Sequence, residues 1–322
     1  MMTLLRRGTV FIFLLGLAIF FSLSSDRFLQ ERNITNILIQ NAHIILVTVG
    51  MTFTMLSGGI DLSVGSVAAL CGAVSAGLLV RNGLPAEVSI LIGLALGFLL
   101  GTINGLLVVV GKLPPFIATL AMLGVARGLT LFYTDGRPVS GLTANYTFWG
   151  RGSIGDIPTP LVVWVVVVIV CTLVLTRTRF GLHVYAVGGN PETARLAGVR
   201  VDRVKVLCYA ISGMLAALAG VLLTGRVNSA QPQAAVGLEL EAITAAVLGG
   251  VSLFGGVGNI PSSVVGALLV GVLGNGMNLM RVQSYPQQII QGIVLVAAVA
   301  LDMFTKRLEG ARTLIKARGS TA

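Results

Sequence analysis

The side chains that carry most enzyme chemistry are scarce in this chain. It has two histidines, His43 and His183, and neither belongs to an H-E-x-x-H zinc motif. Three cysteines, Cys71, Cys171 and Cys208, fall in apolar runs without disulfide or metal-ligand spacing, so we interpret them as small buried apolar side chains. The sequence therefore predicts no catalytic centre, no metal site and no cofactor, and it disfavours an intramembrane enzyme.

A nucleotide-binding loop is also missing from the sequence. The nearest candidate, 105–113, has five residues between its glycines instead of four, and it lacks the Ser or Thr that would hold magnesium. Coupling to protons or sodium ions would usually need acidic or polar groups deep in the apolar segments. Asp61 is the plausible acid, but its position beside a helix start favours a capping role, and Asp302 is expected at the membrane interface. An active transporter of this kind has to take its energy from a partner.

The chemistry that remains is hydrogen bonding by uncharged groups within apolar segments. Such groups could contact a polar solute without holding it tightly, and the candidates for a translocation path are Ser63, Ser66, Asn104, Asn275 and Asn278. Each could equally form a packing hydrogen bond between helices, worth about 0.6 kcal/mol on average, and packing is slightly favoured for any single residue. Arg127 also lies in an apolar segment, where a charge is costly. In order of preference, it reaches the outer face, pairs with a carboxylate or lines the path.

Glycine spacing marks one apolar stretch, 86–110, as a packed helix. Its 25 residues are enough to cross a hydrocarbon core of ~30 Å. Gly93, Gly97, Gly101 and Gly105 recur every four residues, which places them on one side of the helix and lets another backbone approach closely. A lone membrane anchor needs no such face. We therefore predict a helix inside a bundle, with simple helix-dimer packing as the alternative.

The composition predicts that most of the chain lies in lipid. Hydrophobic residues make up 55% of the 322 residues and charged residues 11%, compared with about 25% charged in typical soluble domains. We expect an all-α integral membrane protein with a single domain, 1–322, and about ten transmembrane helices. The predicted spans are 10–24, 35–57, 62–80, 86–110, 115–134, 160–176, 204–225, 240–255, 262–280 and 286–304, with a partly re-entrant segment as the alternative for 240–255. The first span resembles a signal peptide, but the spans that follow favour an uncleaved helix.

The basic residues predict the orientation of these spans. With a cytoplasmic N-terminus and ten crossings, 14 of the 22 Lys and Arg residues lie in cytoplasmic segments and 7 in outer ones. Both termini are then cytoplasmic, including the basic tail 305–322, and the net charge of +10 marks a cytoplasmic surface near lipid, not a nucleic-acid site. Asn104-Gly105 and Asn275-Gly276 each precede a proline loop, which agrees with a five-plus-five inverted repeat, although chance explains such an echo equally well.

The largest cytoplasmic loop, 177–205, is predicted to hold a short capped helix. Asn190 suits the N-cap, Pro191 the first helical position and Glu192 the positive end of the helix dipole, and Gly198 can close the helix. The segment consists of Asn190, Pro191, Glu192, Thr193, Ala194, Arg195, Leu196, Ala197 and Gly198. Such a helix suits docking into a groove on another protein. These residues alone leave an ordinary solvated helix equally open.

Six sequence motifs occur in order along the chain. They are GGIDLSVGS at 58–66, KLPPFIATL at 112–120, RG at 127–128, TRFGLHVYAVGGNPETARLAGV at 178–199, GRVNSAQP at 225–232 and GLELEAITAAVLGGVSLFGGVG at 237–258. With these motifs, nearly the whole chain resembles the permease subunit of bacterial ABC importers for ribose and related sugars. The first 30 residues and the tail after Phe304 carry no diagnostic match.

The resemblance implies partners and a location. It implies a multi-pass protein of the bacterial inner membrane, a homodimeric pore, a cytoplasmic ATPase that binds ATP and magnesium, and a periplasmic sugar-binding protein. It also implies that 191–198 docks onto the ATPase as the coupling helix. The implied cargo is a ribose-like pentose or a related sugar. The alternatives are import of autoinducer-2 by the same machinery and an ion-coupled or facilitative small-solute carrier that works without an ATPase.

The outer loops hold polar residues that could receive the binding protein. Complementary charge steers such association, and the candidates are Arg137, Arg151, Arg226 and Gln231. A polar elbow begins at Arg226, before the predicted span 240–255. Glu239 and Glu241 follow this elbow, close to the start of that span. One sequence does not rank these outer sites.

Overall fold

The computed structural model describes residues 2–283, 285–300 and 303, and most of them are helical. The first half of the chain forms α1 (Met2–Ser24), α2 (Glu31–Gln40), α3 (Ala42–Leu56), α4 (Val64–Val80), α5 (Ala86–Val109) and α6 (Pro115–Thr134). The second half forms α8 (Thr159–Arg177), α9 (Arg179–Gly189), α10 (Pro191–Leu196), α11 (Val201–Val227), α12 (Leu238–Leu248), α13 (Ile260–Leu279) and a further helix, Tyr285–Ala300. Asp302 and the tail 305–322 lie outside the described residues.

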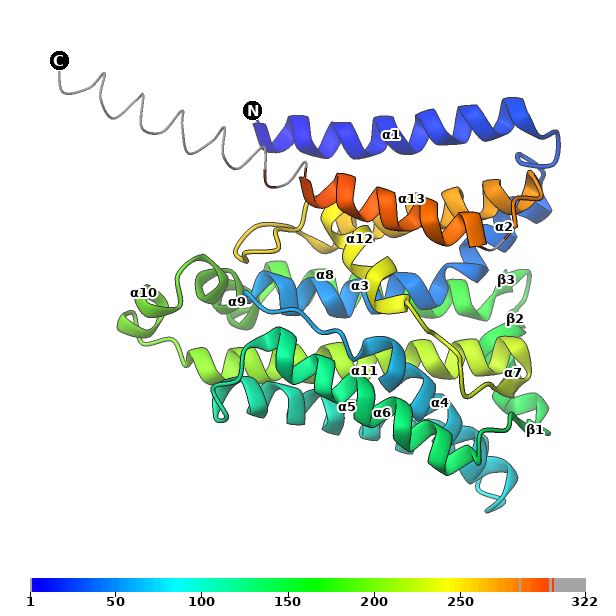
Figure 1. Cartoon of the computed structure of the whole chain (residues 1–322), viewed down its shortest axis with the longest axis horizontal. Coiled ribbons are helices and arrows are strands. Elements are labelled where there is room, and N and C mark those ends of the chain that lie inside the picture. Colours follow the sequence, from blue (N-terminus) through cyan, green and yellow to red (C-terminus); the bar gives the residue numbers. More distant parts are fainter. Residues whose placement is uncertain (1, 284, 301–302, 304–322) are drawn as a thin grey trace.

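The long helices run roughly along one direction and form a bundle (Figure 1). Within the described residues, five helices are long and apolar enough to cross a membrane, namely α5, α6, α8, α11 and α13. The pair α2–α3 passes the same test with a bend of 42° between its two parts. Three shorter apolar helices are Ile12–Ser24, α4 and Tyr285–Ala300. A bundle of apolar helices is therefore confirmed, whereas ten full-length helices are not.

The predicted span 240–255 is helical only in its first part. Helix α12 ends at Leu248, and an irregular loop follows until α13 begins at Ile260. Gly250, Gly255 and Gly256 in this loop have φ of +81°, +90° and +72°. Those values lie in the left-handed region that glycine tolerates and that a right-handed helix excludes. Hydropathy alone does not detect this conformation.

Two segments enter the bundle without helical structure and become helical only part of the way through. After α3 the chain returns into the bundle as 57–63, and α4 begins there; after α11 it returns as 228–237, and α12 begins there (Figure 1). The two half-length helices then run towards opposite ends of the bundle. Their starts touch, because a Cβ added to Gly65 would overlap the carbonyl oxygen of Ala235.

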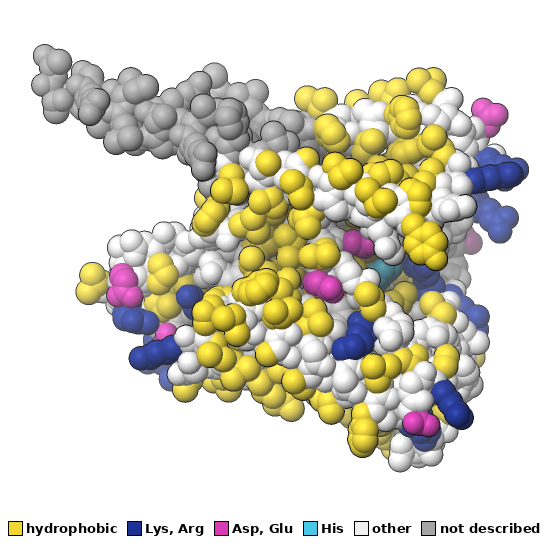
Figure 2. Space-filling view, viewed as in Figure 1, with side chains coloured by type: hydrophobic (Ala, Val, Ile, Leu, Met, Phe, Trp, Pro, Cys, Tyr) yellow, Lys and Arg dark blue, Asp and Glu magenta, His cyan; other side chains and the backbone are white. Residues whose placement is uncertain are grey.

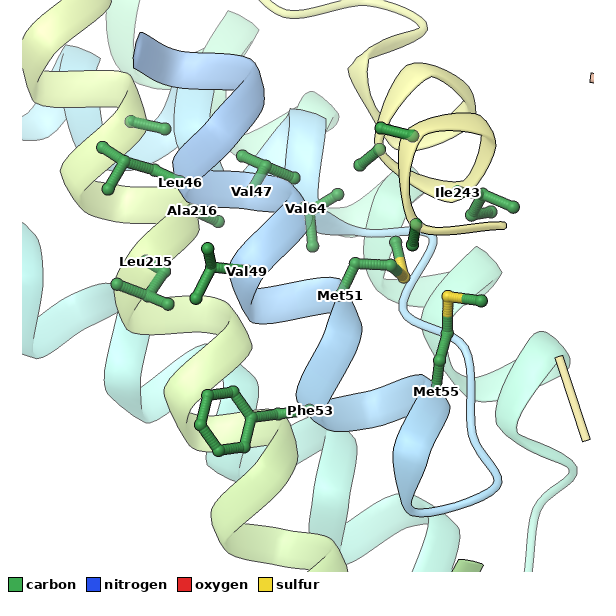
Figure 3. Packing of buried hydrophobic residues seen from close by; sticks show 14 of the residues in the cluster. Leu46, Val47, Val49, Met51, Phe53, Met55, Val64, Leu215, Ala216 and Ile243 are labelled. Carbon is green, nitrogen blue, oxygen red and sulfur yellow. The ribbon is translucent and has the colours of Figure 1, made fainter. Parts of the chain in front are cut away.

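The main apolar core surrounds α3. Every residue of α3 except His43 is buried, as expected for a helix that is apolar on all sides. Figure 3 shows side chains of α3, such as Val49 and Phe53, packed beside α11, and Met51 and Met55 directed towards α12. The core therefore joins α3 to both α11 and α12.

Small elements cap the two ends of the bundle. At one end lie α7 (Ala144–Arg151) and two short antiparallel sheets. Their strands are β1 (Val139–Ser140) paired with β4 (Ser229–Ala230), and β2 (Ser153–Ile154) paired with β3 (Ile157–Pro158). Helices α9 and α10 project from the opposite end, the end at which α1 begins (Figure 1). The loop 177–205 therefore lies at the far side of the bundle from α7.

Candidate functional site

The glycine ladder of α5 lies against two neighbouring helices. A Cβ on Gly97 would overlap the Gly213 carbonyl oxygen of α11, and one on Gly101 would overlap the carbonyl oxygen of Tyr209. At Gly105 it would lie 2.7 Å from the Cα of Val206, also on α11, whereas Gly93 faces Ser75 of α4 at 3.1 Å. The spacing thus serves close backbone contacts, chiefly between α5 and α11.

Asp61 is the centre of a buried hydrogen-bond network. Its side chain is 1% exposed. One carboxylate oxygen accepts hydrogen bonds from the backbone N–H and the hydroxyl of Ser63 at 3.0 and 2.6 Å, and the other accepts from the Ser212 hydroxyl of α11 at 2.9 Å. Asn104 of α5 donates to the Ser63 hydroxyl at 2.8 Å. Asp61 does accept from the start of α4, and it also ties that start to α5 and α11.

The five path candidates do not converge on one route. Ser63, Ser66 and Asn104 are all buried, and two of them belong to the Asp61 network. Asn275 exchanges two hydrogen bonds of 3.0 Å with Asn33, which joins α13 to α2. Asn278 is exposed and accepts from Gln287 at 2.8 Å. Ser63, Asn104 and Asn275 thus form hydrogen bonds between elements of the bundle, Asn278 is the one exposed member of the five, and the translocation path stays a prediction.

Arg127 holds the non-helical segment 228–237 against α6. Its guanidinium donates to the backbone carbonyls of Pro232 and Ala234 at 2.7 and 3.0 Å. It also interacts electrostatically with Glu239 in the first turn of α12. These contacts do not locate Arg127 relative to a membrane face, so the first expectation, that it reaches the outer face, stays a prediction. The nearby carboxylate agrees with the second expectation, although the hydrogen bonds go to carbonyl groups.

A cavity of about 310 Å³ lies between α12, α13 and the helix Tyr285–Ala300. Apolar side chains form most of its wall, and its polar groups are Glu241, Thr244, Gln288 and Gln291. Gln291 donates to the Glu241 carboxylate at 3.4 Å. The sequence did not predict this site, because Glu241 follows the polar elbow that was expected on the outer side. The one available signal was a pair of acids within an apolar run.

The loop 177–205 contains the predicted capped helix. The Asn190 side chain accepts a hydrogen bond from the Thr193 N–H at 2.9 Å, Pro191 occupies the first turn, and Gly198 has a φ of +83°. Leu196 is 90% exposed, while Ala194 is only 4% exposed. The remaining members of the segment, Glu192, Thr193, Arg195 and Ala197, are exposed. Docking would therefore use Leu196 and its exposed neighbours, and not Ala194.

Helix α9 connects this loop to the interior through backbone contacts, which we call the glycine clasp (Leu56, Gly188, Gly256 and Gly258). A Cβ on Gly188 would overlap the Leu56 carbonyl oxygen at the end of α3. The same oxygen accepts from the Gly256 N–H at 3.0 Å, and the Tyr185 hydroxyl donates to the Gly258 carbonyl at 2.8 Å. The clasp therefore joins α9, the end of α3 and the loop after α12.

The four outer docking candidates lie towards the end that carries α7. Arg137 and Gln231 sit close to the β1–β4 pair, and both are exposed. Arg151 ends α7 and is exposed. Arg226 is half-buried and donates to the Gln40 carbonyl at 3.1 Å, so it joins α11 to α2. Three of the four side chains are thus available at this end.

Comparison with known proteins gives consistent matches. The family model described as the permease component of the branched-chain amino acid transport system matches residues 33–299. Ribose import permease protein RbsC of Bacillus subtilis is 48% identical over 91% of each chain. D-allose transport system permease protein AlsC of Escherichia coli is 40% identical over 92% of this chain and 91% of its own. Xylose transport system permease protein XylH of Escherichia coli is 34% identical over 91% of each chain.

Proposed function

The chain belongs to the family of transport-system permeases that includes the ribose import permeases, and we propose that it is the membrane-spanning subunit of an ATP-driven importer for a ribose-like monosaccharide. The observation that carries the proposal is the 48% identity to a ribose import permease along 91% of both chains. Relatives named for allose and xylose transport extend the cargo class to related monosaccharides. A multi-pass location in the bacterial inner membrane follows from the family and the apolar helices.

We infer ten crossings arranged as two inverted halves. The five long helices, the bent pair α2–α3 and the shorter helices α1 and Tyr285–Ala300 supply eight of them. The remaining two would each consist of a non-helical segment and the short helix that follows it, namely 57–63 with α4 and 228–237 with α12. Each would be the third crossing of its half. The opposite directions of α4 and α12 in Figure 1 support an inverted repeat, because inverted halves run in opposite senses through the membrane.

The energy would come from a separate ATPase that binds ATP and magnesium. In this proposal the exposed helix α10 is the coupling helix that docks onto the ATPase from the cytoplasm. The N-terminus then lies in the cytoplasm, since α1 begins at the end that carries α9 and α10. With ten crossings, the C-terminus would lie on the same side. A periplasmic sugar-binding protein would dock at the opposite end, near Arg137, Arg151 and Gln231. A second copy of the permease would complete the pore.

Uptake measurements test this function. Cells that lack the chain should lose uptake of labelled D-ribose, or of another monosaccharide from a panel, and the restored gene should return it. In proteoliposomes, uptake should require the ATPase, ATP and the binding protein together. An ion-coupled or facilitative carrier would instead work alone and stop when the proton gradient collapses. Uptake by the permease alone would contradict the proposal, and autoinducer-2 belongs in the panel as a competing cargo.

A further inference from the structure

The cavity beside α12 is a pre-formed compartment with a distinct polar corner. Its volume of about 310 Å³ is at the lower end of the roughly 300–1,000 Å³ of small-molecule sites. Leu240, Leu273 and Leu295 form part of its apolar wall, while Glu241 and Gln291 contribute polar groups. Figure 2 shows acidic side chains near the centre of this face of the molecule, between two apolar regions.

The depth of this cavity makes its carboxylate unusual. Glu241 stands in the first turn of α12, which begins within the bundle where the non-helical segment 228–237 ends. Ionisable groups at such depth face a bundle interior or a water-filled cavity, because lipid does not solvate them. Glu241 is half-buried and opens into the cavity. This face of α12 is therefore suited to an aqueous compartment and not to lipid.

The polar groups have hydrogen-bonding capacity to spare. A carboxylate offers about four acceptor positions, and the described partner of Glu241 is Gln291 at a long 3.4 Å. Gln291 and Gln288 each carry an amide that donates and accepts, and both line the cavity. This combination matches neighbouring hydroxyl groups, which need acceptors and donors close together.

The chemistry of the wall selects among small polar solutes. The lining holds one acid and no Lys or Arg, so it offers no partner for the carboxylate of an amino acid. A monosaccharide has hydroxyl groups on its edges and apolar C–H faces on its ring. The leucine wall and the polar corner match those two surfaces.

We propose that this cavity is a monosaccharide-binding subsite of the permease itself, in which Glu241, Gln288 and Gln291 hydrogen-bond to the hydroxyls of the passing sugar. The inference rests on the proposed import function. It assigns part of the sugar selectivity to the membrane subunit, in addition to any separate binding protein.

The test uses the complete transporter, with ATPase and binding protein, in proteoliposomes. Uptake of D-ribose and of 2-deoxy-D-ribose is measured for the wild type and for Gln291→Leu and Glu241→Gln. Each variant should reduce the preference for D-ribose by roughly tenfold, the value of one hydrogen bond to a charged or well-placed group. ATPase stimulation by the binding protein is measured in parallel, so that a general loss of coupling is distinguished from a change in sugar preference.

Matched controls separate the subsite from general effects. Gln283→Leu and Glu87→Gln repeat the same substitutions at exposed positions outside the cavity lining, and they should leave the sugar preference unchanged. Gln288→Leu changes an exposed residue that lines the cavity. It provides a second measurement of the sugar preference if Gln291→Leu does not fold. Equal preference in the wild type and in all cavity variants would overturn the subsite alone. Absence of any monosaccharide uptake by the wild type would overturn the import function as well.

Discussion

Gly97 on α5 and Gly213 on α11 lie back to back. A Cβ on either residue would overlap the carbonyl oxygen of the other. The approach of the two backbones therefore leaves room only for glycine at both positions. Such contacts are typical of helices that associate within a membrane, where close van der Waals packing replaces the hydrophobic effect. The α5–α11 contact therefore depends on two positions that must both lack a side chain.

Gly97→Ala should destabilise the protein although alanine is the better helix former. Overpacking costs typically about 1–3 kcal/mol, which exceeds the roughly 1 kcal/mol that alanine gains over glycine in a helix. Gly97→Leu should abolish folding. The measurement is the yield and thermal stability of detergent-purified protein. The matched control is Gly124→Ala in α6, where the new methyl group meets nothing within 4 Å; equal loss at both sites would refute the packing argument.

Asp61→Ala should be more damaging than Ser212→Ala. Removal of the carboxylate leaves the Ser63 N–H and two buried hydroxyls without their acceptor, and each unsatisfied buried group costs about 1–3 kcal/mol. Ser212→Ala removes one donor, and the remaining two hydrogen bonds stay. Thermal unfolding of both single variants and the double variant measures their coupling. Additive effects would mean that the 2.9 Å contact contributes no coupling energy.

Leu196→Asp should leave folding intact and uncouple transport from ATP hydrolysis. The Leu196 side chain is 90% exposed, so a charge there disturbs no internal contact, but it would disrupt an apolar docking site. Ala194→Asp should instead reduce folded yield, because Ala194 is buried. The assay is ATPase stimulation by the binding protein in the assembled transporter. Ile154→Asp changes an exposed apolar residue on the hairpin at the opposite end. It is the control for retention of the ATPase in the purified complex, because the binding protein is proposed to dock at that end.

Cysteine labelling should place the two ends of the bundle on opposite sides of the membrane. After replacement of the three native cysteines, Ile154→Cys should react with a membrane-impermeant maleimide in intact spheroplasts. Leu196→Cys should react only after permeabilisation. The reverse pattern would invert the proposed orientation and remove α10 from the cytoplasm.

Local features of the fold were predictable where the determining residues are neighbours in sequence. Asn190 and Pro191 define the start of α10 because a cap needs only the residues within one turn. The glycine spacing likewise predicted a packing face on α5. It did not identify α11 as the partner, because Val206 and Gly213 carry no signal that links them to a helix about a hundred residues away.

Features that depend on distant partners or on backbone conformation were not predictable. Arg127 binds carbonyl groups more than a hundred positions along the chain, and backbone carbonyls leave no trace in side-chain identity. Glu241 meets Gln291 across fifty residues. The predicted spans broke close to the non-helical segments 57–63 and 228–237. Their entry into the bundle was not predictable, because hydropathy measures transfer from water and does not show where a polar segment lies among the helices.

The glycine clasp has a mechanical consequence. Side chains absorb small displacements by changing rotamer, whereas two backbones in direct contact have no such freedom. Gly188 meets the Leu56 carbonyl without an intervening side chain, and Gly256 is bound to that same oxygen. The joint between α9 and the end of α3 is therefore stiff. A displacement of the loop 177–205 would be transmitted through this joint to Leu56, five residues before Asp61.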